Sequence, residues 1–402
     1  MNPLLSGIRV LDLSRLLPGP YCSLSLAQLG AEVIKIEEPN GGDYARSLSP
    51  ELFDIVNRGK RSITLDLRQG ADVEQFKTLV KDADVVLESF RPGVMEKLGC
   101  GYDTLKTINP KLVYASLTGY GHTGPYASRP GHDLNYLAYA GVLDQTGIKG
   151  KRPAMSNVQI ADLAGGAQNC TIAILAAVMG AKQSGNGCFV DISMLDGALA
   201  LQSMALSTLH RYGTTRPRGQ DMLTGALANY NIYRCRDGKY LAVGSLEPKF
   251  MMAFLKEITP GFLWPKKKKR AVTNRPYDDS RVGAISNRPP KKQESNNDAF
   301  YKLAENPKKL ARIMTPMRWV IQLILITKPR DYWDNKLAHL ETCVSGILSL
   351  DEALKNEQVL ARGLVEQGEK GPLINSPFRF VGAEVLNGIS PKLGEHNSEI
   401  LS

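Results

Sequence analysis

The chain has 402 residues, of which 43% are apolar and 22% are charged, the composition of a globular protein with room for a sizeable core. No stretch approaches the ~20 consecutive apolar residues of a membrane helix, so the composition excludes a membrane span. The first residues lack the parts of a signal peptide, and the final Ile-Leu-Ser is not the S-K-L address. We therefore expect a cytoplasmic protein, with an organelle matrix as the alternative, and no membrane partner.

The formal net charge is +10, but the excess is confined to one segment. Residues 266–292 hold ten Lys and Arg against two Asp and Glu, which gives +8 and leaves +2 for the remaining chain. A basic surface spread over the fold is excluded, and we expect no nucleic-acid partner. The six cysteines form no C-x-x-C pair and the five histidines are scattered, so we expect no metal site.

Short apolar strands alternate with helical patterns in the first half of the chain. Strands are predicted at 8–13, 32–36, 62–67, 85–88 and 112–117, with a helix at 21–29 that Gly30 ends. This alternation predicts an α/β fold, with a Rossmann-like parallel sheet covered by helices on both faces. The first strand leads into Leu-Leu-Pro-Gly-Pro and not into G-x-G-x-x-G, so we expect no NAD or FAD site in the usual place.

The second half begins with an Ala- and Gly-rich segment, 159–182, which predicts a long buried helix. A strand at 188–192, a helix at 195–210 and two β-like runs around Asp237-Gly238 follow, and Pro248 suits the first position of a new helix. We predict a large domain over 1–224, a smaller α/β domain over 225–330, and a return of the chain to the large domain over 331–402. Residues 263–298 are basic and lack apolar periodicity, which predicts an exposed insert.

Three ionisable side chains lie where a site could form. His132 follows a glycine-rich loop and is flanked by Asp133, so it is either a general base near neutral pH or a capping histidine. Asp162 falls in the first turn of the predicted apolar helix, where it is either a functional carboxyl or a simple cap, and Gly165-Gly166 indicates close approach of backbone or ligand. Glu247 precedes Pro248 at a helix start.

Three segments carry a family resemblance: Gly-His-Asp-Leu-Asn-Tyr at 131–136, Ala-Asp-Leu-Ala-Gly-Gly at 161–166 and Leu-Glu-Pro-Lys-Phe at 246–250. Together they resemble the α-methylacyl-CoA racemases, which belong to the family III CoA-transferase (CaiB/BaiF-type) superfamily. Further matching segments lie at 16–20, 57–62, 65–68, 90–94 and 391–396. The resemblance covers roughly residues 4–257 and 330–402, in the right order.

The resemblance implies a two-domain subunit, an interlocked homodimer, a CoA thioester substrate and no separate cofactor. It matches His132 and Asp162 to the two acid/base residues, Glu247 to the partner of the histidine and Asp133 to a neighbouring site carboxylate. The segments that match those holding the CoA thioester supply these residues: Leu65, Asp66, Leu67, Arg68, Gly131, Asn135 and Tyr136. The cations that are candidates for CoA phosphates, or equally for surface charges, are Arg46, Arg58, Lys60, Arg61 and Arg91.

The resemblance implies racemisation of 2-methylacyl-CoA thioesters, in which an imidazole and a carboxylate act on opposite faces of the α-carbon. Backbone N–H groups at a helix N-terminus could stabilise the enolate. The main alternative is a CoA-transferase of the same superfamily, in which Asp162 is a nucleophile. A second alternative is a non-catalytic or nuclear binding protein whose basic segment is its working part.

The chain departs from the family pattern in two places. The resemblance stops between about Pro260 and Lys328, where an insert or a temporarily shifted reading frame would explain the basic stretch. Glu38 stands where some racemases have an arginine that contacts CoA, so that contact is not expected here. The acyl chain of the substrate stays open, from small 2-methylacyl groups to branched fatty acids and bile-acid intermediates.

Overall fold

The structure is a computed structural model, and it describes residues 3–260 and 306–402. Contacts between residues divide the chain into two compact units. Unit 1 comprises Met1–Gly147, Arg152–Ser207 and Leu350–Ser402, and unit 2 comprises Ile148–Lys151 and Thr208–Ser349. The sequence places these changeovers at 224/225 and 330/331.

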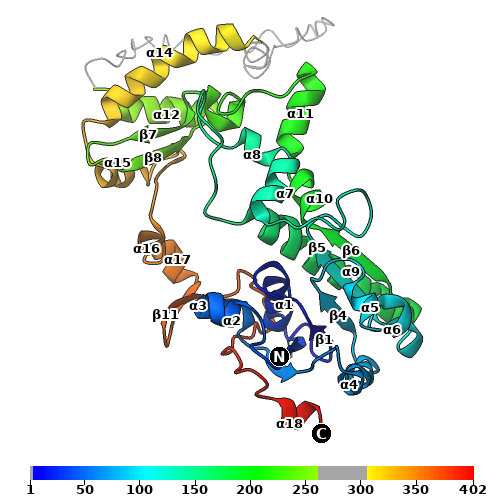
Figure 1. The fold of residues 1–402 in the computed structure, drawn as a ribbon. Coiled ribbons are helices and arrows are strands. Elements are labelled where there is room, and N and C mark those ends of the chain that lie inside the picture. Colours follow the sequence, from blue (N-terminus) through cyan, green and yellow to red (C-terminus); the bar gives the residue numbers. More distant parts are fainter. Residues whose placement is uncertain (1–2, 261–305) are drawn as a thin grey trace, which may run out of the picture. The chain divides into compact units, whose positions relative to one another are not determined.

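Unit 1 is built on a six-stranded parallel sheet (Figure 1). Its strands are β1 (Arg9–Asp12), β2 (Glu32–Glu37), β3 (Arg61–Thr64), β4 (Val85–Glu88), β5 (Val113–Thr118) and β6 (Phe189–Ser193). Their order is β3-β2-β1-β4-β5-β6, the doubly wound arrangement in which the chain changes direction between β1 and β4. The predicted Rossmann-like parallel sheet is therefore confirmed.

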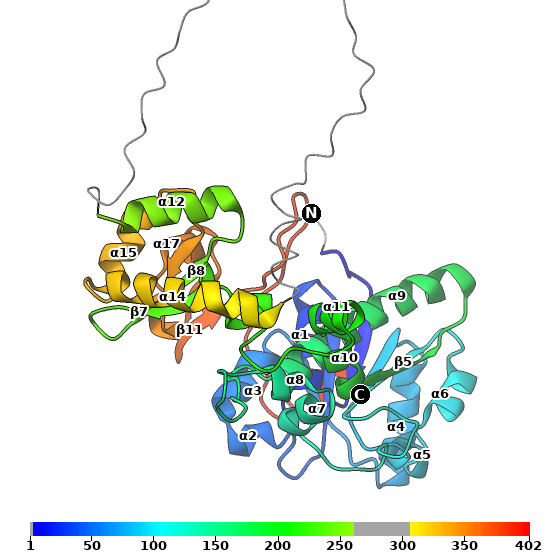
Figure 2. The same cartoon turned by 90° about the horizontal axis from the view of Figure 1, so that it is seen from above.

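Helices cover both faces of this sheet because its strands bury apolar side chains on both sides. On β1, Val10 points into the core beneath α1 (Pro18–Gln28) and α9 (Asn169–Ser184), while Leu11 points into the core beneath α4 (Gly70–Val80) and α6 (Tyr102–Ile108). Figures 1 and 2 show α9 beside β5, with which it is in contact. The other helices of the first 150 residues are α2 (Ala45–Leu48), α3 (Pro50–Asn57), α5 (Val94–Lys97), α7 (Asp133–Tyr139) and α8 (Val142–Gln145).

The predicted long helix at 159–182 differs from expectation at its start. It begins as a π-helix, η1 (Ala161–Gln168), and continues without interruption as α9. Together, Ala161–Ser184 is long and apolar enough to cross a bilayer by length and composition, which the sequence alone did not predict. Its inward residues, including Cys170, Ile174 and Val178, are buried in the core of unit 1, as in the core helix of a globular domain.

The predicted helix at 195–210 is wrong in one respect, because it is two helices. These are α10 (Met194–Ala200) and α11 (Ser203–Tyr212). At the break, the amide of Gln202 donates to the carbonyl of Ala140 and accepts a hydrogen bond from Gln145. These bonds tie the junction between the two helices to the segment around α8.

The C-terminal segment of unit 1 ends against the edge strand β3. It contains α16 (Leu350–Ala353), α17 (Glu357–Ala361), β10 (Val365–Gly368), β11 (Gly371–Ile374) and α18 (Asn397–Ile400). The side chain of Asn397 accepts from the backbone N of Thr64 at 2.9 Å and donates to its hydroxyl at 2.8 Å. The backbone N of His396 donates to the carbonyl of Ser62 at 2.9 Å, so the chain end closes on this edge.

Unit 2 contains a three-stranded antiparallel sheet of β7 (Tyr230–Arg234), β8 (Tyr240–Gly244) and β9 (Val344–Gly346). The predicted hairpin is confirmed, with residues 235–239 joining β7 to β8. The helices are η2 (Met222–Ala226), α12 (Pro248–Ile258), α14 (Pro307–Leu325) and α15 (Arg330–Leu337), and α12 begins at Pro248 as predicted. Phe254, Leu325 and Trp333 lie in the core. The predicted basic insert at 263–298 lies outside the described residues.

Candidate active site at the carboxyl edge of the sheet

The predicted site segments of unit 1 follow the carboxyl ends of its strands. Residues 65–68 follow β3, residues 89–93 follow β4, and the loop 119–131 follows β5 and leads to His132. Because all six strands are parallel, these ends lie along one edge of the sheet, the edge at which doubly wound folds bind ligands.

His132 is the N-cap residue of α7, and its side chain is exposed. Its backbone N donates to the side-chain oxygen of Asn135 at 3.1 Å, and the backbone N of Asn135 donates to the carbonyl of His132 at 2.8 Å. The capping alternative therefore describes the backbone of His132 correctly. Its exposed imidazole stays accessible to a substrate.

Tyr136 fixes the backbone immediately before His132. Its hydroxyl donates to the carbonyl of Gly131 at 2.6 Å, and burial raises its pKa, so the proton for this bond is retained. A Cβ at Gly131 would lie 2.7 Å from the tyrosine ring, and one at Gly119 would lie 2.5 Å from it. Both glycines are therefore required for the ring to lie here, which supports a positioning role for Tyr136.

Asp133 connects α7 to the N-terminus of η1. One oxygen of its carboxylate accepts from the backbone N of Ala161 at 2.7 Å and from that of Asp162 at 3.1 Å. The N-terminus of a helix stabilises an anion, and here the anion is this carboxylate. Because these two N–H groups are occupied, the idea that they stabilise an enolate requires Asp133 to move away.

Asp162 lies in the first turn of η1, as predicted, and is half-buried. Burial, with a smaller contribution from the negative charge of Asp133, raises the pKa of its carboxyl group to about 7. At neutral pH this group is therefore present in both its protonated and its ionised form.

The paired glycines after Asp162 serve contact between helices. A Cβ at Gly165 would lie 2.8 Å from the backbone N of Ala198, and one at Gly197 would lie 1.9 Å from the carbonyl oxygen of Gly165. Both distances are shorter than any real contact, so η1 and α10 approach backbone to backbone. Of the two explanations that the sequence left open, the structure supports the close backbone contact.

Lys60 is buried inside unit 1. Its ammonium donates to Asp12 at 3.1 Å, Ser23 at 2.7 Å and Asn57 at 2.8 Å, and burial lowers its pKa to about 8. Burial alone would raise the pKa of Asp12, but Lys60 and Lys35, with two serine hydroxyls, bring it down to about 2. The structure thus supports an internal ion pair at Lys60.

Arg46 and Arg58 are also engaged within unit 1. Arg46 donates twice to Glu37, at 2.7 Å each, and lies over the ring of Phe53 at 3.8 Å. Arg58 is 5% exposed, donates to the carbonyl of Ile374, and has its pKa lowered by burial. Both arrangements support a role in holding the chain together.

Two of the predicted CoA-binding residues are arginines that lie at the surface near strand ends. Arg91 is exposed after β4 and is close enough to Tyr136 for its charge to act on the pKa of the phenol. Arg68 is exposed and pairs with Asp66 at 2.7 Å and with Glu38 at 3.3 Å. Glu38 therefore partly neutralises the cation nearest to it.

The remaining predicted residues are placed as follows. Leu65 is buried, Leu67 is half-buried and Asn135 is exposed. Arg61 pairs with Glu32 at 2.8 Å. Glu247 lies in unit 2 as the exposed N-cap residue of α12, and its partnership with His132 stays a prediction.

Sequence reasoning missed a group of polar residues at the end of β4, within β5 and in the loop after β5. Glu88 is 3% exposed, and burial raises its pKa to about 7. Ser116 is fully buried, and its hydroxyl lies 2.7 Å from Nε2 of His122. The sequence signal was weak: a glutamate ending an apolar strand, and a histidine with no adjacent carboxylate.

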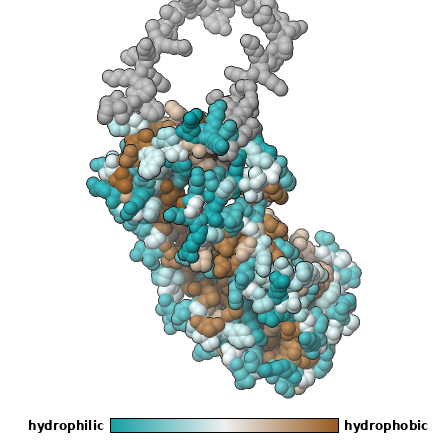
Figure 3. Space-filling view, turned by 45° about the horizontal axis from the view of Figure 1, so that its top comes forward, coloured by the Kyte–Doolittle hydropathy of each residue, from teal (hydrophilic) through white to brown (hydrophobic). Residues whose placement is uncertain are grey.

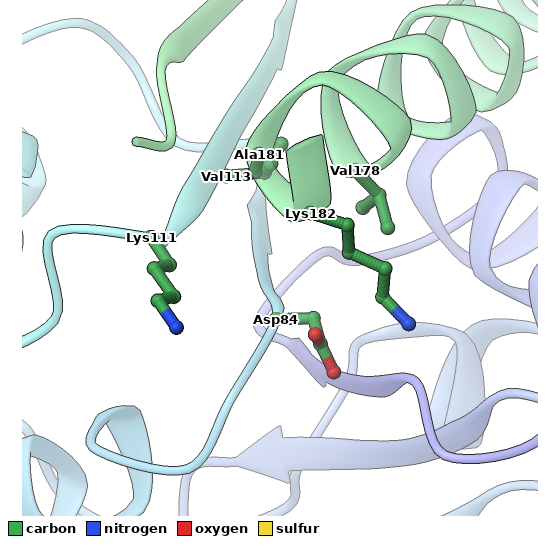
Figure 4. A pocket seen from close by; sticks show the side chains of 6 residues that line it. All are labelled: Asp84, Lys111, Val113, Val178, Ala181 and Lys182. Carbon is green, nitrogen blue, oxygen red and sulfur yellow. The ribbon is translucent and has the colours of Figure 1, made fainter. Parts of the chain in front are cut away.

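A cavity of about 280 Å³ lies at the opposite edge of the sheet (Figure 4). It is lined by Asp84, Lys111, Val113, Val178, Ala181 and Lys182. Because Asp84 precedes β4 and Val113 begins β5, the cavity lies at the amino ends of the strands. It is therefore not part of the candidate site. Among residues 3–260 and 306–402, the structure has no group of three or more His, Cys, Asp or Glu side chains that could hold a metal ion.

A family model described as CoA-transferase family III matches residues 5–283 and 292–397. Human α-methylacyl-CoA racemase is 40% identical over 252 residues, which are 63% of this chain and 64% of that protein, so less than two thirds of it is matched. The succinate–glutarate CoA-transferase of Agrobacterium fabrum is 31% identical, with 100% of this chain and 96% of that protein aligned. Among solved structures, a CAIB/BAIF family protein from Brucella suis is 28% identical, with a TM-score of 0.80 and 100% of both chains covered.

The family match corrects one expectation from the sequence. The resemblance was expected to stop between about residues 260 and 328, but the match continues to residue 283 and resumes at residue 292. Only eight residues in this region, 284–291, fall outside it. With this match and the doubly wound sheet, the chain belongs to CoA-transferase family III.

Proposed function

We propose that this protein is a 2-methylacyl-CoA racemase that works by two-base proton transfer. The observation that carries the proposal is the carboxyl group of Asp162, half-buried at the start of η1 with its pKa raised to about 7. Asp133, which is adjacent to His132 in the sequence, accepts hydrogen bonds from the backbone at the start of η1 and so links this helix start to the segment that carries His132. A group with a pKa near the working pH can both remove and deliver a proton, as racemisation requires in its two directions.

In the proposed reaction, one base takes the α-proton and the C–H bond breaks. The electron pair moves into the thioester carbonyl, which gives an enolate, and the second group delivers a proton to the opposite face of the same carbon. Asp162 acts on one face and the imidazole of His132 on the other. No electrons leave the substrate, so the proposed reaction needs no redox cofactor, and CoA is part of the substrate.

We propose that the CoA moiety lies along the carboxyl edge of the sheet. Arg91 and Arg68 are exposed there, and Arg guanidinium groups suit phosphate oxygens. Lys60, Arg46 and Arg58 are left out of this proposal, because each is bound inside unit 1. Arg68 would have to exchange its carboxylate partners for a phosphate.

The alternative function is CoA transfer, with Asp162 as the nucleophile. The end-to-end match to a CoA-transferase favours this reading. A nucleophilic carboxyl must be ionised, however, and a pKa of about 7 leaves about half of it protonated at neutral pH. The intact mass of the protein after mixing with an acyl-CoA distinguishes the two, because a nucleophilic Asp162 acquires a covalent acyl or CoA adduct and a racemase does not.

We also propose that the protein forms a homodimer. Apolar residues gather in brown areas on the face drawn in Figure 3. In unit 1, side chains of three successive helices are more than half exposed, among them Ile172, Met179, Leu199 and Met204. Exposed apolar area of this kind is typical of protein interfaces.

Single enantiomers of a 2-methylacyl-CoA in deuterated water test the racemase proposal. The wild-type protein should exchange the α-proton of both enantiomers and lose their chirality. Asp162→Asn should lose exchange with one enantiomer and His132→Ala with the other, and neither variant should racemise. If both variants racemise at the wild-type rate, the two-base assignment is wrong.

A further inference from the structure

Three polar residues lie side by side across three neighbouring strands of the sheet. In the register of the sheet, Glu88 of β4 is opposite Ser116 of β5, which is opposite Asp191 of β6. Opposite residues of parallel strands point to the same face. Glu88 is 3% exposed and Ser116 is fully buried, so their polar groups destabilise the fold unless each is hydrogen-bonded.

A continuous chain of hydrogen bonds satisfies these groups. The hydroxyl of Ser116 bonds to the carboxyl of Glu88 on one side and lies 2.7 Å from Nε2 of His122 on the other. Oε2 of the Glu88 carboxyl accepts from the backbone N of Phe90 at 2.6 Å. The backbone N of His122 donates to Asp191 at 3.0 Å, so both ends of the chain are anchored to backbone.

The two anchors belong to the two segments that frame the candidate site. Phe90 lies in the turn after β4, next to Arg91, and His122 lies in the loop 119–131 that leads to His132. The hydrogen-bonded residues Glu88 and Ser116 lie on the face of the sheet opposite to η1. Leu87 and Leu117 pack in the core that contains Ala161, while Glu88 and Ser116 alternate to the opposite face. These residues are therefore separate from the proposed acid/base groups.

The charges that face Glu88 favour its neutral form. Burial is the main cause of its raised pKa, and Glu96 of α5 and Asp191 of β6 add to it. The phenol of Tyr114 also lies close enough to interact with it. When Glu88 is protonated, it donates to Ser116, which donates to Nε2 of His122. When Glu88 is ionised, the direction reverses, and Nε2–H of His122 donates to Ser116, which donates to Glu88.

We propose that Glu88, Ser116 and His122 form a positioning chain that couples the turn after β4 to the loop after β5. The chain holds these segments in one relative arrangement, so that CoA bound at the turn is aligned with the acid/base residues. This inference rests on the proposed function in one respect, namely that the turn after β4 holds CoA. None of the three residues touches the reacting atoms, so each is a positioning residue.

Amide hydrogen exchange of the whole protein tests the coupling without any substrate. Ser116→Ala and His122→Phe each break the chain, and the phenylalanine keeps the ring contact that His122 makes with Phe189 at 4.9 Å. Both variants should speed exchange in the turn 89–93 and in the loop 119–131. His122→Gln keeps a hydrogen-bonding group and should restore protection. Tyr114→Phe is the matched control, because this buried hydroxyl has no hydrogen-bond partner in the described part of the chain.

Calorimetric titration with free CoA gives the functional readout. The chain-breaking variants should bind CoA about tenfold more weakly, the scale of one buried hydrogen bond, and Tyr114→Phe should bind it as the wild type does. Glu88→Gln cannot ionise, so its CoA affinity should vary less with pH around 7 than that of the wild type.

The proposal is overturned if His122→Phe leaves exchange in the turn 89–93 unchanged, or if Tyr114→Phe is as disruptive as Ser116→Ala. The failure of the proposed function looks different. In that case the coupling appears in the hydrogen-exchange data and in CoA affinity, while no α-proton exchange is found with any acyl-CoA.

Discussion

Replacing Asp133 by Asn should lower the pKa of Asp162 and shift the pH dependence of activity. The asparagine oxygen can still accept from the backbone N of Ala161 and of Asp162, so the helix start keeps its geometry. Only the negative charge is lost. Two causes raise the pKa of Asp162 from its ordinary value of 3.8 to about 7, and burial is the larger of them. Asp133 therefore accounts for less than half of the shift, and we expect a fall of about 1 unit.

The assay is the pH dependence of α-proton exchange for the enantiomer from which Asp162 removes the proton. The base form is the carboxylate, so a lower pKa makes the variant active at lower pH. The acidic midpoint should fall by about 1 unit, which corresponds to about 1.4 kcal/mol. Carbon-13 NMR of the Asp162 carboxyl group should show the same shift without turnover.

Asp196→Asn is the control for this prediction. Asp196 is an exposed carboxylate in the first turn of α10, which packs on η1, and it is not among the causes of the Asp162 shift. Its loss should leave the midpoint unchanged. An unchanged or higher midpoint in Asp133→Asn would refute the electrostatic role of Asp133.

Three further predictions concern stability. Lys60→Met leaves Asp12 as a buried charge without its ammonium partner and should lower the free energy of unfolding by about 3–5 kcal/mol in denaturant titrations. In the wild type, the lowered pKa of Asp12 stabilises the fold above pH 3.8 by about 2 kcal/mol, and this contribution should disappear as pH falls towards 2. Asp12→Asn has no carboxylate at this position, so its stability should lack this part of the pH dependence. Gly165→Ala places a Cβ 2.8 Å from the backbone N of Ala198 and should cost about 1–3 kcal/mol, whereas Gly180→Ala in the same continuous helix meets nothing within 4 Å and should raise the melting temperature slightly.

The sheet of unit 1 could be predicted because its strands are short apolar runs bounded by turns. The bounds of β4 are those that the sequence predicts, and the other five strands are within a few residues of prediction. The π-helical start of the long helix could not be predicted, since π- and α-helices share the same local composition. The break at Gln202 depends on hydrogen bonds to residues about 60 positions away.

The candidate site could be predicted only where the residues that act together are also neighbours in the sequence. Asp133 beside His132 is visible in the sequence, but its bonds to the start of η1 are not, because they join residues 28 and 29 positions apart. The burial of Lys60 could not be predicted, because its partner Asp12 lies 48 positions away in the sequence. Residue type alone does not distinguish a buried charge from an exposed one.

The most direct test of the central claim is deuterium incorporation at the α-carbon of a single-enantiomer 2-methylacyl-CoA, followed by mass spectrometry and chiral analysis, with no acceptor acid present. A two-base racemase should incorporate one deuterium at the α-carbon and yield both enantiomers. If no deuterium is incorporated, and CoA instead passes to an added carboxylic acid, the racemase account is contradicted and Asp162 is a nucleophile.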